Sequence, residues 1–174
     1  MNKKVIISLT GRSCTGKSTI GDAIKQKYNG IYTVDYDRVK RQLSGYNHEV
    51  DAADMRTLSL GFFEVVCKLG KPILLLVPPF YDEAQYLEYK KVADSFGYDF
   101  HVFEFTASRD VLIKRYRERL EGIEKAGNKV LIKTEEEYLK TLDTPYFVPK
   151  NAVLFDTSND GGEAMADKVL NVLS

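Results

Sequence analysis

A glycine-rich segment near the N-terminus has the residue types and the spacing needed to bind phosphate groups. It spans Gly11–Ser18, reads GRSCTGKS, and fits the pattern G-x-x-x-x-G-K-[ST] at every fixed position. Gly11 and Gly16 let the backbone curl, so that successive N–H groups point inward toward phosphate oxygens. Lys17 supplies a cation for the β- and γ-phosphates, and the Ser18 hydroxyl is a hard oxygen ligand for Mg²⁺. The segment therefore predicts a site for a purine nucleoside triphosphate, ATP with Mg²⁺.

The flanking sequence provides the strand and the helix that such a loop requires. Val5–Leu9 is a short apolar run with β-branched residues, which is typical of a buried parallel strand. Ser18–Tyr28 has apolar residues at helical spacing, and the positive end of its dipole would face the phosphates. This context argues against a chance glycine-rich turn. We expect nucleotide contacts from Gly11, Ser13, Cys14, Thr15, Gly16, Lys17, Ser18 and Thr19.

Strands and helices alternate along the rest of the chain. Further strands are expected at 31–34, 72–77, 99–105 and 152–155, and helices at 37–43, 51–69, 82–96, 108–120, 134–142 and 162–173. The alternation predicts a parallel sheet with helices on both faces and right-handed crossovers. Ligands of such folds bind beyond the carboxyl ends of the strands, where the glycine-rich segment lies. For the helix at 51–69 we expect a buried face made of Met55, Leu58, Phe62, Val65 and Leu69.

Length and composition indicate a globular protein of one domain, spanning 1–174. The 25 basic and 25 acidic side chains balance, which argues against a dedicated nucleic-acid binder. Cys14 and Cys67 form neither a disulfide framework nor a metal-spacing motif. The apolar run after Lys4 is too short for a signal peptide or a membrane span. We expect a cytoplasmic monomer or homodimer that does not contact a membrane.

An acidic and basic segment follows the second predicted strand, at 37–45, and reads DRVKRQLSG. A hydroxyl group that attacks a phosphate needs a carboxylate within hydrogen-bond reach, and Asp37 would lie near the glycine-rich segment in such a fold. Asp35 lies two residues earlier and is a second candidate. The alternative is that Asp37 only caps its helix.

Arg115 and Arg119 are four residues apart in the helix expected at 108–120. This spacing puts both guanidinium groups on one face of the helix. A planar cation stacks on an aromatic ring and also stabilises the spread negative charge of a phosphoryl group. The alternative is a solvated face, since Arg117 and Glu118 lie on the same helix.

Together these segments resemble the small P-loop kinases related to nucleoside-monophosphate kinases. The resemblance is greatest to the small-molecule and polynucleotide 5′-hydroxyl kinases, the zeta-toxin-like set, and covers nearly the whole chain. Residues 37–45 are similar to the D-x-x-R-x-x-L-x-G segment of that set, with Lys40 at the arginine position. The resemblance implies a three-layer P-loop NTPase fold with five parallel strands in the order 2-3-1-4-5. It also implies a short lid, for which the polar segment 121–133 has the right position, although an ordinary exposed loop fits equally.

The resemblance also implies the residue roles. Lys17, Asp37 and Arg119 would be catalytic, and Arg115 would lie along the adenine ring. The remaining assignments are Ser18 for the metal, Asp37, Arg38, Lys40 and Arg41 for the acceptor, and the backbone of Asp156–Asn159 for the base. One departure is that the third strand is followed by Pro78-Pro79, where relatives often have an acidic residue that anchors Mg²⁺. Two alternatives stay open: Asp35 takes this metal role, or the metal relies on Ser18 and water.

The leading hypothesis is a kinase that transfers the γ-phosphoryl group of ATP to a hydroxyl or phosphate. The acceptor stays open among a small molecule, a nucleotide and a nucleic-acid 5′ end. The rival hypothesis is a regulatory or interaction module that binds nucleotide and hydrolyses ATP weakly. The departure after the third strand favours this rival slightly.

Overall fold

The computed structural model describes residues 4–125 and 134–173. Its centre is a five-stranded parallel sheet in the order β2-β3-β1-β4-β5, which confirms the expected α/β fold class and strand order. The strands are β1 (Val5–Gly11), β2 (Tyr32–Asp35), β3 (Ile73–Leu76), β4 (Asp99–Thr106) and β5 (Val153–Asp156). The helices are α1 (Lys17–Lys27), α2 (Tyr36–Lys40), α3 (His48–Cys67), α4 (Glu83–Ser95), α5 (Arg109–Lys125), α6 (Glu135–Asp143) and α7 (Gly162–Val172).

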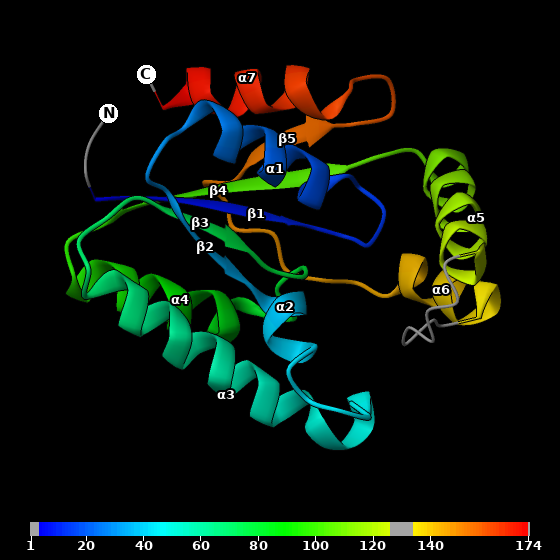
Figure 1. The fold of residues 1–174 in the computed structure, drawn as a ribbon, viewed down its shortest axis with the longest axis horizontal. Coiled ribbons are helices and arrows are strands. Elements are labelled where there is room, and N and C mark those ends of the chain that lie inside the picture. The colour runs from blue at the N-terminus through cyan, green and yellow to red at the C-terminus, as the bar shows by residue number, and fades with distance from the viewer. Residues whose placement is uncertain (1–3, 126–133, 174) are drawn as a thin grey trace.

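Helices cover both faces of the sheet, so the molecule has three layers (Figure 1). Side chains alternate along β1: Ile6 belongs to the core beneath α3 and α4, whereas Ile7 and Leu9 belong to the core beneath α1 and α7. Both faces are apolar because a parallel sheet with crossover helices is buried on both sides. The helices α5 and α6 lie beyond the carboxyl ends of the strands, at the right of Figure 1.

The long helix α3 differs from the expectation in the face that it buries. Met55 is buried as predicted, but Leu58, Phe62, Val65 and Leu69 are 54%, 45%, 55% and 51% exposed. The buried side instead consists of Met55, Ser59, Phe63, Val66 and Cys67. Apolar residues occur at helical spacing on two sides of α3, so their periodicity alone does not select the side that meets the sheet.

Two boundaries bear on the candidate site. Helix α5 extends to Lys125, so the first part of the segment predicted as a lid, 121–125, is helical. The remainder of that segment, 126–133, lies outside the described residues. Helix α2 begins at Tyr36 rather than at Asp37, which changes the residue that caps it. Within 4–125 and 134–173, no helix combines the length and the apolar character needed to cross a membrane.

Candidate active site

The glycine-rich loop connects β1 to α1 at the carboxyl end of the sheet, and its glycines are required by the geometry. Gly11 has φ of 136°, and a Cβ there would lie 2.3 Å from the carbonyl oxygen of Phe105. Gly16 has φ of 90° and Cys14 has φ of 68°, so the loop turns through left-handed conformations on both sides of Thr15. Thr15 is fully buried, and its hydroxyl donates to the Arg12 carbonyl at 2.9 Å. The loop is therefore held as a closed turn.

Lys17 folds back across the start of this loop. Its ammonium group donates to the carbonyl oxygens of Gly11 and Arg12, at 2.5 and 2.8 Å. Burial of the charge lowers the pKa of Lys17 to about 8, and the nearby carboxyl groups of Asp37 and Glu104 oppose this shift. The fold thus brings the Lys17 and Asp37 side chains within electrostatic reach of each other, although they come from different strand ends.

Asp35, and not Asp37, caps helix α2. Its Oδ1 accepts hydrogen bonds from the backbone N–H groups of Asp37 and Arg38, at 2.9 and 3.3 Å. Its Oδ2 also pairs with Nε of Arg38 at 3.4 Å. The alternative that Asp37 is only a helix cap is therefore wrong. Asp37 is exposed, and its side chain makes no hydrogen bond or ion pair with any residue in the described part of the chain.

The cations expected to bind the acceptor lie within four residues of Asp37 in the sequence, but their side chains do not meet at one point. The ammonium group of Lys40 lies over the ring of Tyr46, 4.7 Å from its centroid. Arg38 is paired with Asp35, as described above, and is 66% exposed. Arg41 is the exposed C-cap residue of α2.

Both arginines of the expected pair on α5 contact the loop. Arg115 donates to the carbonyl oxygen of Thr157 at 2.6 Å and to that of Cys14 at 3.4 Å. Arg119 donates to the Ser13 hydroxyl at 3.4 Å. The guanidinium of Arg115 thus joins the loop to Thr157, in the turn after β5. Because both side chains contact the loop, the alternative that they lie on a solvated helix face is wrong.

The expected nucleotide-binding residues Ser18 and Thr19 lie in the first turn of α1, next to Lys17. Both are exposed. A Cβ added at Gly162 would lie 2.7 Å from Cγ2 of Thr19, so the methyl group of Thr19 packs against the start of α7. The Ser18 hydroxyl is a hard oxygen donor beside the loop, of the kind that Mg²⁺ accepts.

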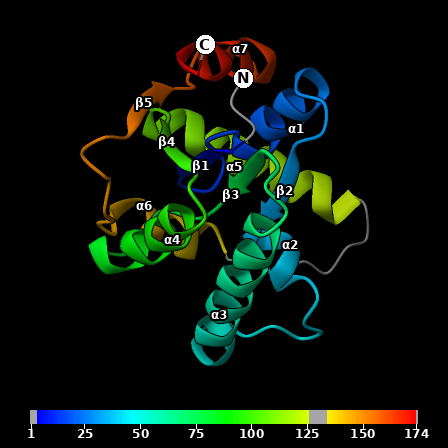
Figure 2. The same ribbon diagram turned by 90° about the vertical axis from the view of Figure 1, so that its left-hand side faces the viewer.

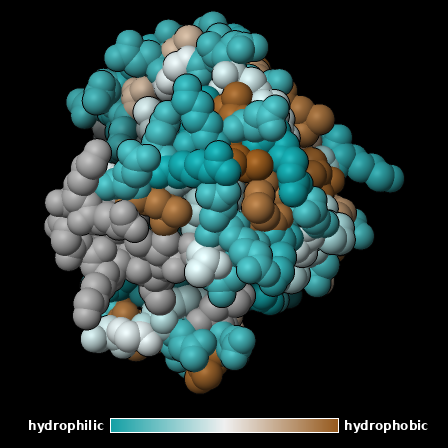
Figure 3. Space-filling view, turned by 90° about the vertical axis from the view of Figure 1, so that its right-hand side faces the viewer, coloured by the Kyte–Doolittle hydropathy of each residue, from teal (hydrophilic) through white to brown (hydrophobic). Residues whose placement is uncertain are grey.

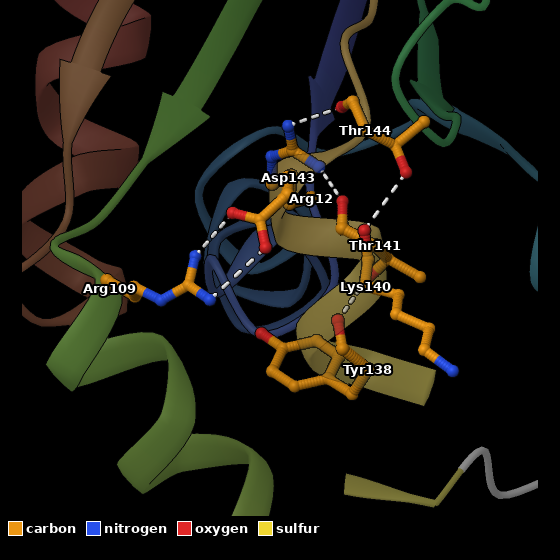
Figure 4. A network of polar contacts seen from close by, with 7 residues as sticks. All are labelled: Arg12, Arg109, Tyr138, Lys140, Thr141, Asp143 and Thr144. Carbon is orange, nitrogen blue, oxygen red and sulfur yellow. Dashed lines mark hydrogen bonds and ion pairs between the residues drawn. The ribbon is translucent and has the colours of Figure 1, made fainter. Parts of the chain in front are cut away.

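Helix α6 supports the loop, and sequence reasoning missed this. The Tyr138 hydroxyl donates to the Ser13 carbonyl at 3.1 Å, and its ring stacks on Tyr116 with centroids 3.9 Å apart. The guanidinium of Arg12 donates to the carbonyl oxygens of Thr141 and Thr144 at the end of α6 (Figure 4). The sequence identified α6 as a helix but contains no signal for contacts between residues this far apart in the chain.

The same close-up shows how α6 is fixed to α5. Arg109 at the start of α5 forms a bidentate ion pair with Asp143 at the end of α6, with a shortest distance of 2.7 Å (Figure 4). The end of the molecule where these helices meet the loop is largely hydrophilic over the described residues (Figure 3). A polar surface at the carboxyl end of the sheet suits a charged ligand.

Glu104 is the second acid beside Lys17 and was also missed. It lies on β4, opposite Thr10 of β1, and is 1% exposed. Burial raises the pKa of this carboxyl group, whereas a 2.7 Å hydrogen bond from the Tyr146 hydroxyl and the charge of Lys17 act in the opposite direction. The available signal was one glutamate within an otherwise apolar stretch of strand.

The fold and the loop define a nucleotide-binding protein of the P-loop class. The family model described as "AAA domain" matches residues 6–142, and the chain belongs to this family. A comparison with curated proteins found no match.

Three solved structures have this fold over nearly the whole chain. The Mycobacterium tuberculosis APS kinase, solved with AMPPNP and APS, is 18% identical with a TM-score of 0.66, covering 99% of each chain. A gluconokinase from Sinorhizobium meliloti 1021 is 15% identical with a TM-score of 0.66, covering 99% of this chain and 93% of its own. The Deinococcus radiodurans tunicamycin resistance protein is 16% identical with a TM-score of 0.63, covering 99% and 96%. The likeness confirms the expected resemblance to small P-loop kinases at the level of the fold.

Proposed function

We propose that this chain is an ATP-dependent kinase that transfers the γ-phosphoryl group of ATP to a small molecule, a nucleotide or a nucleic-acid end. The observation that carries the proposal is the arrangement of Asp35, Asp37 and Lys17. Because Asp35 caps α2, the Asp37 carboxylate has no partner among residues 4–125 and 134–173 while lying within electrostatic reach of Lys17. A free carboxylate beside a phosphate-binding lysine is what acceptance of a hydroxyl proton requires.

Phosphoryl transfer depends mostly on positioning and on charge stabilisation, and the described residues fit both tasks. Asp37 would orient or deprotonate the acceptor hydroxyl, and Lys17 and Arg119 would stabilise the transferring group. If the acceptor atom is a phosphate oxygen, Asp37 would position it and would not act as a base. Arg115 and the turn around Thr157 would form the wall on which adenine lies.

Magnesium fits the oxygen donors beside the loop. The Ser18 hydroxyl would bind the ion directly, and Mg²⁺ would neutralise charge on the phosphates when bound. Asp35 was the other predicted ligand, but both of its carboxylate oxygens already serve the helix cap and Arg38. Our proposal therefore gives Ser18 the direct contact and leaves Asp35 as the residue that holds α2 in place.

The acceptor would bind on the α2 side of the loop, where Arg38, Lys40 and Arg41 lie. Their charges suit an acceptor that carries a phosphate or carboxylate group. The APS kinase and the gluconokinase of the same fold have anionic molecules in their names, which supports this reading. We retain two further parts of the hypothesis as proposals: a single kinase domain over 1–174, and a lid at about 121–133 that excludes water during transfer.

The second candidate function is a regulatory module that binds ATP without a small-molecule acceptor. One observation favours it: β3 ends at Leu76 and is followed by Val77 and two prolines, so no acid lies directly after the strand beside the loop. Such a module would hydrolyse ATP slowly, and added acceptors would not change the rate.

An acceptor panel separates the two functions. ADP formation is measured with saturating Mg·ATP and with nucleosides, nucleoside monophosphates, 5′-hydroxyl oligonucleotides, sugar acids and antibiotics in turn. We expect at least one acceptor class to raise the rate of ADP formation about tenfold or more over the rate with water alone. With ATP labelled at the γ-phosphate, the product should carry the label. A uniform rate across the panel, with ATP binding intact, would reject the kinase and favour the module.

A further inference from the structure

The outward side of α3 carries an apolar stripe that the fold leaves uncovered. The stripe consists of Leu58, Phe62, Val65 and Leu69, each about half exposed. Leu58, Phe62 and Val65 are spaced four and three residues apart on one face of α3, as at the a and d positions of a coiled coil, and Leu69 follows directly after the C-cap residue Lys68. Helix α3 lies at the lower edge of the molecule in Figure 1 and toward the viewer in Figure 2, and no described element lies beyond it.

Gly61 lies within this stripe, in the middle of a 20-residue helix. A Cβ added there would meet nothing within 4 Å. Glycine in an exposed helix interior costs roughly 0.5–1 kcal/mol relative to alanine, and no contact in the described chain requires it. A glycine on a helix surface does allow a second helix to approach closely.

The charges beside the stripe differ at its two ends. Asp51 and Asp54 lie toward its N-terminal end, and Lys68 and Lys71 lie toward its C-terminal end. Among residues 4–125 and 134–173 the Asp54 carboxylate has no hydrogen-bond or ion-pair partner. Asp51 accepts a hydrogen bond from the Asn47 N–H at 2.7 Å, and Lys68 pairs with Glu64 at 3.2 Å. Two such helices attract each other when they run antiparallel, whereas a parallel arrangement places like charges together.

We propose that the α3 stripe binds a second copy of this chain, with the two α3 helices antiparallel and crossing at Gly61. About residue 61, Asp54 and the C-cap residue Lys68 are symmetrically placed. A single register therefore sets Asp54 against Lys68 of the second copy. In the same register Leu58 lies beside Val65 of the second copy, and Phe62 packs over the opposing glycine. This is the self-complementary surface that a two-fold dimer needs.

The size of the stripe sets the expected affinity. Four half-exposed side chains cover less area than the ~800 Å² per partner of a standard interface. The dimer should therefore be in equilibrium with monomer, with a Kd on the order of micromolar. Its attraction has an ionic part, so raising salt should weaken it.

Sedimentation velocity from about 1 to 200 μM tests the proposal directly. The wild-type chain should pass from monomer to dimer over this range, whereas Phe62→Glu should stay monomeric with an unchanged melting temperature, since Phe62 lies outside the core. The matched control is Leu87→Glu on α4, where Leu87 is 49% exposed, and this variant should dimerise like wild type. A monomer at every concentration, or a dimer that survives Phe62→Glu, would overturn the proposal.

Two further variants test the geometry. Asp54→Lys should weaken the dimer about tenfold or more, and Asp54→Lys combined with Lys68→Asp should restore it. Gly61→Cys should form an intermolecular disulfide under mild oxidation, because residue 61 meets its own copy at the crossing. Val50→Cys, near the start of α3, should not. The antiparallel register would be rejected if the double variant Asp54→Lys, Lys68→Asp did not restore the dimer. It would also be rejected if Val50→Cys formed the intermolecular disulfide and Gly61→Cys did not.

Discussion

The state of Lys17 predicts that nucleotide binding takes up a proton at alkaline pH. Without nucleotide its pKa is about 8, because burial of the charge disfavours the protonated form. Triphosphate oxygens placed beside the ammonium group would favour protonation and raise this pKa. At pH 9 about a tenth of the free protein has Lys17 protonated, so binding should take up about 0.9 proton, against about 0.2 at pH 7.5. The affinity for ATP should fall about eightfold between these pH values, or roughly 1.3 kcal/mol.

Calorimetric titration of Mg·ATP in pairs of buffers with different ionisation enthalpies measures this proton uptake. Lys17→Arg is the control, because arginine stays charged throughout this range and should bind with no pH-dependent uptake. Equal uptake by wild type and by Lys17→Arg, or affinity that does not change between pH 7.5 and 9, would refute the reasoning.

The same lowered pKa means that the folded chain binds fewer protons than the unfolded chain between about pH 8 and 10.5. The Lys17 contribution to stability should therefore rise with pH in this window, and thermal melts of Lys17→Met should lack that rise.

Substitutions in the loop, in α2 and in α6 probe the positioning of the site. Gly11→Ala forces a Cβ to within 2.3 Å of the Phe105 carbonyl oxygen, so it should lower the melting temperature and weaken ATP binding by more than about tenfold in calorimetry. Gly16→Ala also places alanine at a positive φ, of 90°, but its Cβ would meet only Ile20 at 3.9 Å, so it should lower the melting temperature less than Gly11→Ala. Asp35→Ala removes the cap of α2 and should cost about 1 kcal/mol in urea unfolding, whereas Asp35→Asn keeps a capping oxygen and should cost less than half of that. Tyr138→Phe removes the hydroxyl that donates to the Ser13 carbonyl, and should cost about 1 kcal/mol of stability and weaken ATP binding several-fold; binding equal to wild type would mean that α6 does not support the loop.

The sequence predicted the fold well because its signals were local and agreed with one another. The glycine-rich loop, the apolar strand before it and the helix after it each support the same β1–loop–α1 unit. The alternating pattern then fixed a parallel sheet, and the family resemblance supplied the strand order. In the candidate site, the four-residue spacing of Arg115 and Arg119 predicted that they share a helix face, and the packing of α5 brings both side chains to the loop.

The errors arose where the structure depends on contacts between distant residues or on a shift of one residue. Both sides of α3 have apolar residues at helical spacing, and only packing against the sheet buries Phe63 and exposes Phe62. Helix α2 begins one residue earlier than predicted, so Asp35 is its N-cap residue and Asp37 is not. The contact between Tyr138 and Ser13 joins residues that are 125 positions apart, which no local pattern reveals.

The central claim is that Asp37 acts on the acceptor while Asp35 only holds the helix that carries it. The most direct test compares Asp37→Asn with Asp35→Asn, using the acceptor that the panel identifies and measuring both ATP affinity and the rate of phosphoryl transfer. For a hydroxyl acceptor, Asp37→Asn should bind ATP within about twofold of wild type and transfer phosphate at least about a hundredfold more slowly. Asp35→Asn, which keeps the cap, should transfer within a few-fold of wild type. Transfer at the wild-type rate by Asp37→Asn would contradict the account.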